Sequence, residues 1–339
     1  MKHLALSRLQ ILAFRRSTGA LDRRLGASQE SLRTAAFAGL QDSMPRAALL
    51  SLHARIEATT RDVWEDERLV QLWGPRFNVY AVAADDIAVF ALGTMPGDAR
   101  GMARAHDLAA RLSDQLAGKA MPYDDVGLAM GLNPNALRYA AATGTVLIRW
   151  VGAGQTLVWV TSPPDMDAVE ARLELARRYL HVFGPATPES FGRWAGIGAH
   201  ESKTAFDRLG AELITVWTPV GLSWLLAADE AAARAEALQP NAVRLLPSGD
   251  AYYLAWGRDR ELIVGEEARR EELWTSRVWP GALLVNGEIE GTWRRAGANL
   301  VVRPWSALTA TGRDAVVAEA ESLPLPAVGP KPISVRFEA

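Results

Sequence analysis

The stretch TPESFGRWAGIGAHESKTAFDRLGAELITVWTPVGLSWLL, residues 187–226, decides the fold class. It begins with Thr187-Pro188, a typical N-cap followed by proline in the first helical turn. Gly196-Ile197-Gly198 then predicts a tight turn into a second helix over about residues 200–209. The alternating apolar residues of 213–226 predict a two-stranded hairpin. Helix, turn, helix and hairpin in this order are typical of a winged helix-turn-helix unit.

The same order of elements occurs twice earlier in the chain. Each copy has two or three short helices and then a hairpin, where the apolar spacing changes from a period of about 3.6 to a period of about two. In the first copy these elements lie near residues 4–16, 28–40, 45–58 and 68–82. In the second copy they lie near residues 103–119, 123–130, 134–142 and 146–160. We therefore predict three tandem winged-helix units, over residues 1–95, 96–163 and 164–238.

Beyond residue 238 the chain changes to short strand-like segments. They lie near residues 243–247, 252–256, 283–285 and 291–294. Asn286-Gly287 between the last two is a strong signal for a two-residue hairpin turn. We predict a small antiparallel β-barrel or sheet over residues 239–322, with a helix near its end, and a loose or surface-packed Pro-rich tail over 323–339. The fold class is therefore α+β.

The composition excludes several kinds of site. The chain has no cysteine, which excludes disulfides and thiolate metal sites. Its five histidines are scattered without metal-binding spacing, so we expect no metal and no cofactor. There is no Gly-rich phosphate loop and no Gly-x-Ser-x-Gly motif. No apolar run reaches the roughly 18 residues of a membrane span. We therefore expect no membrane association and a cytoplasmic location.

The charge is unevenly distributed along the chain. The net charge is −2, yet residues 1–60 carry nine basic and four acidic side chains. Of the 37 Lys and Arg residues only four are lysine. Arginine suits bidentate contact with phosphates, and the asymmetry suggests one face for a polyanion. The arginine excess is equally explained by the codon usage of a GC-rich genome.

A polar elbow lies between two predicted helices in the stretch GLQDSMPRAALLSL, residues 39–52. Gln41, Asp42 and Ser43 place an amide, a carboxylate and a hydroxyl side by side. Polar side chains held between two packed helices can form a small hydrolytic centre. Asp42 or Ser43 can equally be an ordinary N-cap, because Pro45 follows in the first turn. One residue can have both roles.

Four motifs in the same order, covering about residues 5–322, make the chain resemble the AlkZ-type DNA glycosylases. They are LQDSMPRAAL (residues 40–49), DERLV (66–70), VRLLP followed by Asp250 (243–250) and VNGEIEGTWR (285–294). The resemblance implies tandem winged helices and a terminal β-barrel that form a C-shaped, DNA-holding channel. It also implies excision of bulky or cross-linking alkylated purines. In some relatives this activity protects the producer of a genotoxic natural product from its own compound.

The chain departs from the family pattern at two places. Relatives typically carry Gln-x-Gln or Gln-x-Asp at the elbow. Here Gln41 matches the first position, Ser43 occupies the last and Asp42 adds a carboxylate between them. The Arg-Gly-Thr-Leu-His-like wing of the family appears as Arg76-Phe77-Asn78-Val79-Tyr80, without the Gly, Thr and His.

The implied chemistry tolerates an altered elbow. An N7- or N3-alkylated purine is already cationic, so its glycosidic bond breaks to release a neutral base. The reaction then requires a positioned water and stabilisation of an oxocarbenium-like sugar. We expect Gln41 to orient the water, Asp42 to polarise it or face the developing charge, and Ser43 to add a hydrogen bond. Because no lysine lies at the elbow, we expect a monofunctional glycosylase without strand cleavage.

Six basic side chains are candidates for contact with double-stranded DNA, although each is also an ordinary solvated cation. They are Arg46, Arg55, Arg76, Lys203, Arg294 and Arg295. The alternative function is a catalytically silent winged-helix DNA-binding protein, a lesion sensor or a transcription regulator. No coiled-coil pattern or long apolar stripe predicts a dimer, so we expect a monomer.

Overall fold

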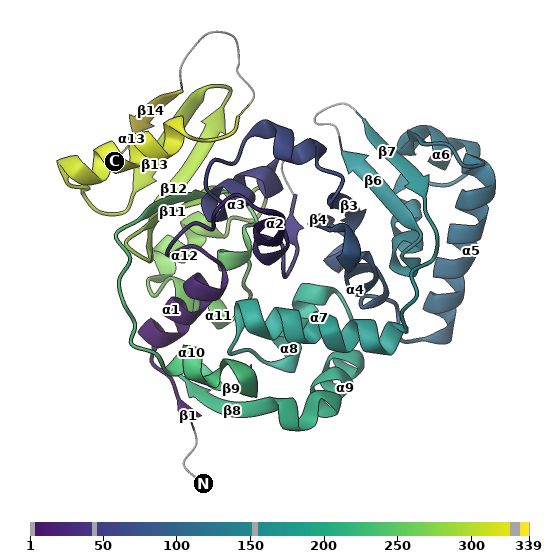
Figure 1. Ribbon diagram of the computed structural model, residues 1–339, viewed down its shortest axis with the longest axis horizontal. Helices are drawn as coiled ribbons and strands as arrows, with labels where there is room; N and C mark the ends of the chain where they lie inside the picture. Colours follow the sequence, from purple (N-terminus) through teal and green to yellow (C-terminus); the bar gives the residue numbers. More distant parts are fainter. Residues whose placement is uncertain (1–3, 43–45, 151–154, 326–332, 339) are drawn as a thin grey trace.

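The computed structural model describes residues 4–42, 46–150, 155–325 and 333–338. These residues form a mixed α+β fold with three β-sheets. In Figure 1 the sheets lie at the upper right, the upper left and the bottom of the view, and helix α7 (Ala168–Phe183) lies between them. The buried face of α7, including Tyr179 and Phe183, packs against Phe191 and Trp194 in the largest hydrophobic cluster.

The first sheet has six strands and joins the two predicted N-terminal hairpins. In spatial order the strands are β2 (Leu40–Gln41), β4 (Val79–Ala83), β3 (Leu69–Trp73), β6 (Val146–Trp150), β7 (Thr156–Val160) and β5 (Met121–Pro122). Both hairpins predicted from the alternating residues are confirmed. They meet where Gln71 of β3 pairs with Ile148 of β6, so the sheet runs through both predicted units.

Helices and 3₁₀ turns surround this sheet. The helices are α2 (Gln29–Ala35), α3 (Ala47–Arg55), α4 (Ile87–Leu92), α5 (Ala99–Leu116) and α6 (Tyr123–Ala129). The 3₁₀ segments are η1 (Arg61–Glu65), η2 (Pro75–Phe77), η3 (Ala84–Asp86) and η4 (Pro134–Thr143).

The helix predicted over residues 28–40 is wrong at its C-terminal end. Helix α2 stops at Ala35, and Leu40 and Gln41 are extended and pair with Ala81 and Tyr80 of β4. Gly39 allows this change of direction, since its φ is +69° and an added Cβ would lie 2.8 Å from the ring of Phe90. The elbow is therefore a strand end that leads into α3.

The stretch that predicted the third unit folds as expected. Its elements are α8 (Pro188–Ala195), α9 (Ala199–Leu209), η5 (Gly210–Glu212), β8 (Leu213–Thr218) and β9 (Gly221–Leu226). The short η6 (Ala227–Asp229) and α10 (Glu230–Arg234) follow. The Thr187 side chain caps α8, and Gly196 ends that helix in a left-handed conformation, as the sequence indicated.

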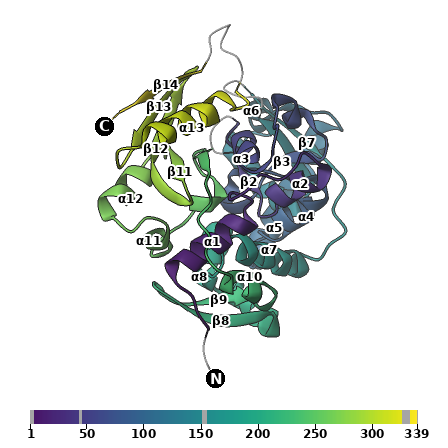
Figure 2. The same cartoon turned by 60° about the vertical axis from the view of Figure 1, so that its left-hand side comes forward.

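The N-terminal segment packs on the third unit. Strand β1 (Leu4–Ala5) pairs in parallel with β8, and α1 (Arg8–Thr18) begins after a capping box formed by Ser7 and Gln10. Figure 2 shows α1 running between α11 on one side and α7 and α10 on the other. The helix predicted over residues 4–16 therefore begins at Arg8. The three domain boundaries stay a prediction.

The C-terminal sheet consists of β10 (Val243–Leu246), β11 (Gly281–Val285), β12 (Glu288–Ala296), β13 (Asn299–Pro304) and β14 (Ser334–Phe337), in this order. Its Asn286-Gly287 turn has both residues at positive φ, which confirms the hairpin. Of the two alternatives predicted for residues 239–322, the antiparallel sheet is confirmed and the barrel is wrong for the described residues. The outer strands β10 and β14 do not pair, and β14 runs parallel to β13. Residues 334–337 of the predicted tail form this edge strand, so for them the surface-packed alternative holds and the loose tail does not.

Short helices replace one predicted strand in the same region. Residues 252–256 were expected to be extended, but Asp250 caps the 3₁₀ turn η7 (Ala251–Tyr253) by accepting a hydrogen bond from the Tyr252 backbone. The helices that follow are α11 (Asp259–Ile263), α12 (Glu267–Leu273) and α13 (Ala310–Glu321). The last of these confirms the helix expected near the end of residues 239–322.

Candidate active site

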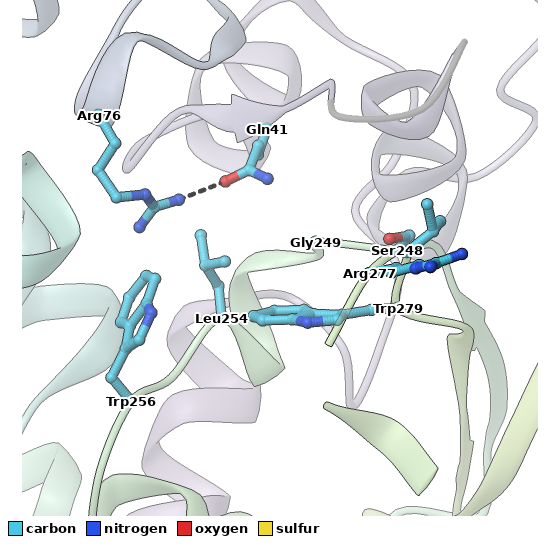
Figure 3. A pocket seen from close by; sticks show the side chains of 9 residues that line it. Gln41, Arg76, Ser248, Gly249, Leu254, Trp256, Arg277 and Trp279 are labelled. Atoms are coloured by element: carbon cyan, nitrogen blue, oxygen red, sulfur yellow. Dashed lines mark hydrogen bonds between the residues drawn. The ribbon is translucent and has the colours of Figure 1, made fainter. Parts of the chain in front are cut away.

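A cavity of about 270 Å³ opens between the elbow strand and two C-terminal loops. This volume is near the lower end of the roughly 300–1,000 Å³ of ordinary ligand pockets. Figure 3 shows Gln41 and Arg76 on one side and the indoles of Trp256 and Trp279 on the other. The full lining is Gln41, Arg76, Ser248, Gly249, Leu254, Trp256, Arg277, Val278 and Trp279.

Gln41 is the described elbow residue that lines this cavity. Its Oε1 accepts a hydrogen bond from Nη2 of Arg76 at 2.6 Å and one from Oη of Tyr80 at 3.4 Å. A guanidinium can only donate, so the amide oxygen must face Arg76. The amide nitrogen therefore lies on the side away from Arg76, as Figure 3 shows, and has no hydrogen-bond partner among the described residues.

Asp42 points into the protein instead. It is 1% exposed; Oδ1 accepts a hydrogen bond from the Ala48 backbone at 3.0 Å, and Oδ2 accepts one from Nε2 of Gln71 at 2.9 Å. Burial raises the pKa of Asp42 to about 7, although the Ala48 hydrogen bond and the charge of Arg46 oppose this shift. Asp42 thus accepts a hydrogen bond from the first turn of α3 but is not its N-cap residue. The N-cap position is Arg46 and the helix begins at Ala47, so the ordinary N-cap role suggested for Asp42 is wrong. Ser43 lies outside the described residues.

The arginines at the two ends of α3, Arg46 and Arg55, form contacts within the protein. Arg55 is 2% exposed and forms a bidentate ion pair with Asp250, at 2.7 and 2.8 Å. Burial by itself raises the pKa of Asp250, but Arg55 holds this pKa below its usual value. Arg46 is half-buried, lies 4.6 Å from the ring of Trp64 and donates to the Trp150 carbonyl. Arg55 therefore has a structural contact where the sequence suggested a phosphate contact.

The other predicted basic residues divide into two groups. Arg76 lines the cavity, and Arg294 and Arg295 line a neighbouring hollow that shares Ser248, Val278 and Trp279 with it. Lys203 lies on α9, lines neither hollow and pairs with Asp207 at 2.6 Å. The structure therefore brings together Gln41 and three of the predicted arginines.

Sequence reasoning missed the opposite wall of the cavity. Trp256, Arg277 and Trp279 come from loops after β10 and before β11, about 200 residues from the elbow in the chain. A local signal was present, since the turn Pro247-Ser248-Gly249-Asp250 places small and polar residues directly before an aromatic segment.

Comparison with known proteins assigns this arrangement to a family. The family model described as "DNA glycosylase AlkZ-like" matches residues 34–324, a range that holds both Gln41 and the loops opposite it. The chain belongs to the AlkZ-like DNA glycosylase family. DNA glycosylases are hydrolases that act on N-glycosyl bonds. The match confirms the resemblance drawn from the four sequence motifs.

Two matches from Streptomyces sahachiroi, one in sequence and one in structure, show how far the similarity of this AlkZ-like chain extends. An "interstrand DNA cross-link repair glycosylase" is 30% identical over 151 residues, which are 42% of this chain and only 38% of that protein. The solved structure of the "DNA glycosylase AlkZ" superposes with a TM-score of 0.79 at 18% identity and covers 99% of this chain and 100% of that one. The second likeness shows a shared fold.

The described residues contain no cluster of three or more histidine, aspartate or glutamate side chains arranged to hold a metal ion. Within the same ranges, none of the helices has the length and apolar character needed to cross a membrane.

Proposed function

We propose that this chain is a monofunctional DNA glycosylase that hydrolyses the N-glycosidic bond of bulky N7- or N3-alkylated purines in duplex DNA. The observation that carries the proposal is the position of Gln41, whose amide faces a cavity walled by Trp256 and Trp279. Family membership and the name of the Streptomyces sahachiroi relative, an interstrand DNA cross-link repair glycosylase, support it.

The cavity suits a planar base taken out of the DNA stack. Indole rings provide faces on which a flipped base stacks, and enzymes that act on a base extrude it into such a pocket. A cationic alkylated purine leaves as a neutral base, so the site needs little acid catalysis. Gln41 is the group proposed to hold the attacking water against the sugar. Asp42 supports this amide indirectly by accepting a hydrogen bond from the first turn of α3, and Ser43 is proposed as an auxiliary hydrogen-bond partner.

The rim of the cavity suits the DNA backbone. Arg277, Arg294 and Arg295 surround the two hollows, and none of them pairs with a carboxylate among the described residues. Many arginines elsewhere on the described surface do pair with carboxylates. Examples are Arg68 with Asp66, Arg177 with Glu212, Arg234 with Glu230 and Arg303 with Glu338. Unpaired guanidinium groups attract phosphates and release their counterions.

The fold organisation belongs to the same proposal. Residues 1–95, 96–163 and 164–238 are proposed as tandem winged helix-turn-helix units, and the order α8, α9, β8 and β9 supports this for the third unit. The protein is proposed to act on DNA as a monomer and to protect its host from a DNA-alkylating natural product.

The test is release of a damaged base. A duplex that carries a bulky N7-guanine adduct is incubated with the protein and then heated in alkali, which cleaves abasic sites. We expect cleavage with the wild type and a loss of at least about 100-fold in rate with Gln41→Ala, because the water then lacks its positioning group. Gln115→Ala, at an exposed position of α5, is the matched control and should keep the wild-type rate.

Two outcomes decide against parts of this proposal. If the adduct is retained while the protein still binds the duplex, the chain is the catalytically silent DNA-binding protein. If the strand breaks without alkali and borohydride traps a covalent complex, the enzyme uses a Schiff base. None of the residues that line the cavity is a lysine, so we expect neither break nor complex.

A further inference from the structure

We infer that Arg76 is a positioning residue that fixes the amide of Gln41, and that Gly196 in the turn between α8 and α9 holds Arg76 in place. This inference rests on the proposed function of Gln41. It assigns to Arg76 a role different from phosphate contact, and it gives a role to a glycine far from the elbow in the chain.

The guanidinium of Arg76 is held on three sides. Nη2 donates to Oε1 of Gln41 at 2.6 Å, and Nη1 donates to the Trp194 carbonyl at 3.4 Å. The guanidinium carbon lies 4.4 Å from the ring centre of Trp256, a cation–π contact. These contacts come from the first sheet, from α8 and from the C-terminal loops. A group tied to three separate parts of the fold has little freedom to follow a DNA backbone.

The backbone of Arg76 is also constrained. Arg76 has φ 56° and ψ 26°, in the left-handed region, and Phe77 after it has φ 56°. This conformation is unfavourable for a non-glycine residue, so surrounding contacts must impose it. Gly196 supplies one of these contacts, because a Cβ added there would lie 2.9 Å from both N and Cα of Arg76. Gly196 itself has φ +75°, so glycine is required there for two independent reasons.

The consequence for Gln41 is a defined amide orientation. A charged donor bound to Oε1 makes a stronger hydrogen bond than a neutral one, so flipping the amide would lose this bond and bring two donors together. Gln41 therefore presents its NH₂ group to the cavity. This NH₂ group would hold a water or a base by donating a hydrogen bond to it. Gln41 keeps this orientation only while Arg76 stays in place.

The kinetic test separates positioning from DNA binding. Single-turnover excision at saturating enzyme is measured for Arg76→Met, Arg76→Lys and Gly196→Ala. We expect the rate constant to fall about 100-fold in Arg76→Met and in Gly196→Ala, with partial recovery in Arg76→Lys. Affinity for a duplex with an abasic-site analogue should stay within about threefold of wild type. The double variant Arg76→Met/Gly196→Ala should be no slower than the slower single variant.

A second glycine is the matched control for backbone strain. Gly131 has φ +66° and nothing lies within 4 Å of a Cβ added there, so Gly131→Ala tests the left-handed conformation without the contact. We expect it to keep the wild-type rate constant. Equal losses in Gly131→Ala and Gly196→Ala would overturn the role of Gly196. Wild-type rates in Arg76→Met, or a fall in affinity that matches the fall in rate, would overturn the role of Arg76.

An NMR measurement of the Gln41 side chain tests the inference independently of catalysis. In protein labelled with ¹⁵N-glutamine, the side-chain amide signal that disappears in Gln41→Ala belongs to Gln41. In the wild type we expect the ¹⁵N and ¹H shifts of this signal to differ from those of a solvent-exposed glutamine amide, because Oε1 accepts a charged hydrogen bond. In Arg76→Met and Gly196→Ala we expect the shifts to move towards those of an exposed glutamine amide. If the wild type releases no adduct, the proposed function fails, whereas the amide signal still decides whether Arg76 orients Gln41. An unchanged signal in Arg76→Met refutes the inference.

Discussion

Two neighbouring residues of the elbow have opposite surroundings, and strand geometry explains why. Gln41 of β2 pairs with Tyr80 of β4, and the backbone N–H of Asp42 continues this pairing with the Val79 carbonyl. Successive side chains of an extended strand point to opposite faces. The amide therefore faces the cavity and the carboxylate faces the core.

The buried carboxylate predicts a pH-dependent stability. The pKa of Asp42 is about 7 in the folded protein against an ordinary value of 3.8, so the folded state binds this proton more tightly than the unfolded chain. The stabilisation by that proton is complete below about pH 4 and is lost as the pH rises through about 7, at up to about 1.4 kcal/mol per pH unit. In urea unfolding, we expect the wild type to lose more stability than Asp42→Asn between pH 5 and pH 8.

The control for this prediction is Asp85→Asn, at an exposed carboxylate near the same sheet. It should follow the wild-type pH dependence, because its carboxylate is not buried. If the stability of Asp42→Asn and that of the wild type change equally with pH, Asp42 is ionised throughout this range. Its hydrogen bond to the Ala48 backbone then does not require the proton.

At the scale of elements, strand β12 presents two adjacent arginines beside the cavity. Arg294 donates to the Val278 carbonyl and Arg295 to the Gly297 carbonyl, and neither pairs with a carboxylate among the described residues. Each phosphate contact contributes about 0.9 to the slope of log K against log salt concentration. We expect Arg294→Gln/Arg295→Gln to make this slope less steep by up to about 2, measured by fluorescence anisotropy with a labelled duplex.

The matched control for these arginines lies on the next strand. Arg303 of β13 is already paired with Glu338, so Arg303→Gln should leave the salt slope unchanged. A slope that changes equally in both variants would indicate a general effect of net charge and would argue against a specific DNA contact at β12.

At the scale of the whole molecule, a buried ion pair joins α3 to the C-terminal part of the chain. Arg55 and Asp250 are almost 200 residues apart and form two hydrogen bonds, and Ser51 donates a third to the same carboxylate at 2.6 Å. This contact fixes the loop that begins the cavity wall, because Asp250 also caps η7. The pair thus connects the elbow helix with the opposite side of the candidate site.

Breaking this pair should destabilise the protein without removing a DNA contact. Removal of one partner from a buried ion pair leaves an uncompensated charge and costs about 3–5 kcal/mol. We expect Arg55→Met to lower the free energy of unfolding by this amount in urea, in one cooperative transition. Its affinity for duplex DNA should remain that of the wild type at temperatures where it is folded. A loss of affinity with unchanged stability would restore the phosphate role suggested by the sequence.

The sequence by itself determined the local elements and the family. Capping residues, glycine turns and apolar periodicity act over a few residues, so α8, α9, the three hairpins and the Asn286-Gly287 turn follow from the pattern. The same local rules selected Gln41 as a candidate residue. They failed where a distant partner decides the conformation, as for residues 252–256 and for β14, which needs the edge of β13.

Only the tertiary structure decided which side chains share the candidate site. Gln41, Arg76 and Trp256 meet because strands, helices and loops far apart in the chain pack together, and no local spacing encodes this contact. The direction of a side chain depends on pairing and burial, which turned Asp42 inward and committed Arg55 to Asp250. Chemical type is readable from a single residue, whereas the direction and partner of a side chain depend on the whole packed chain.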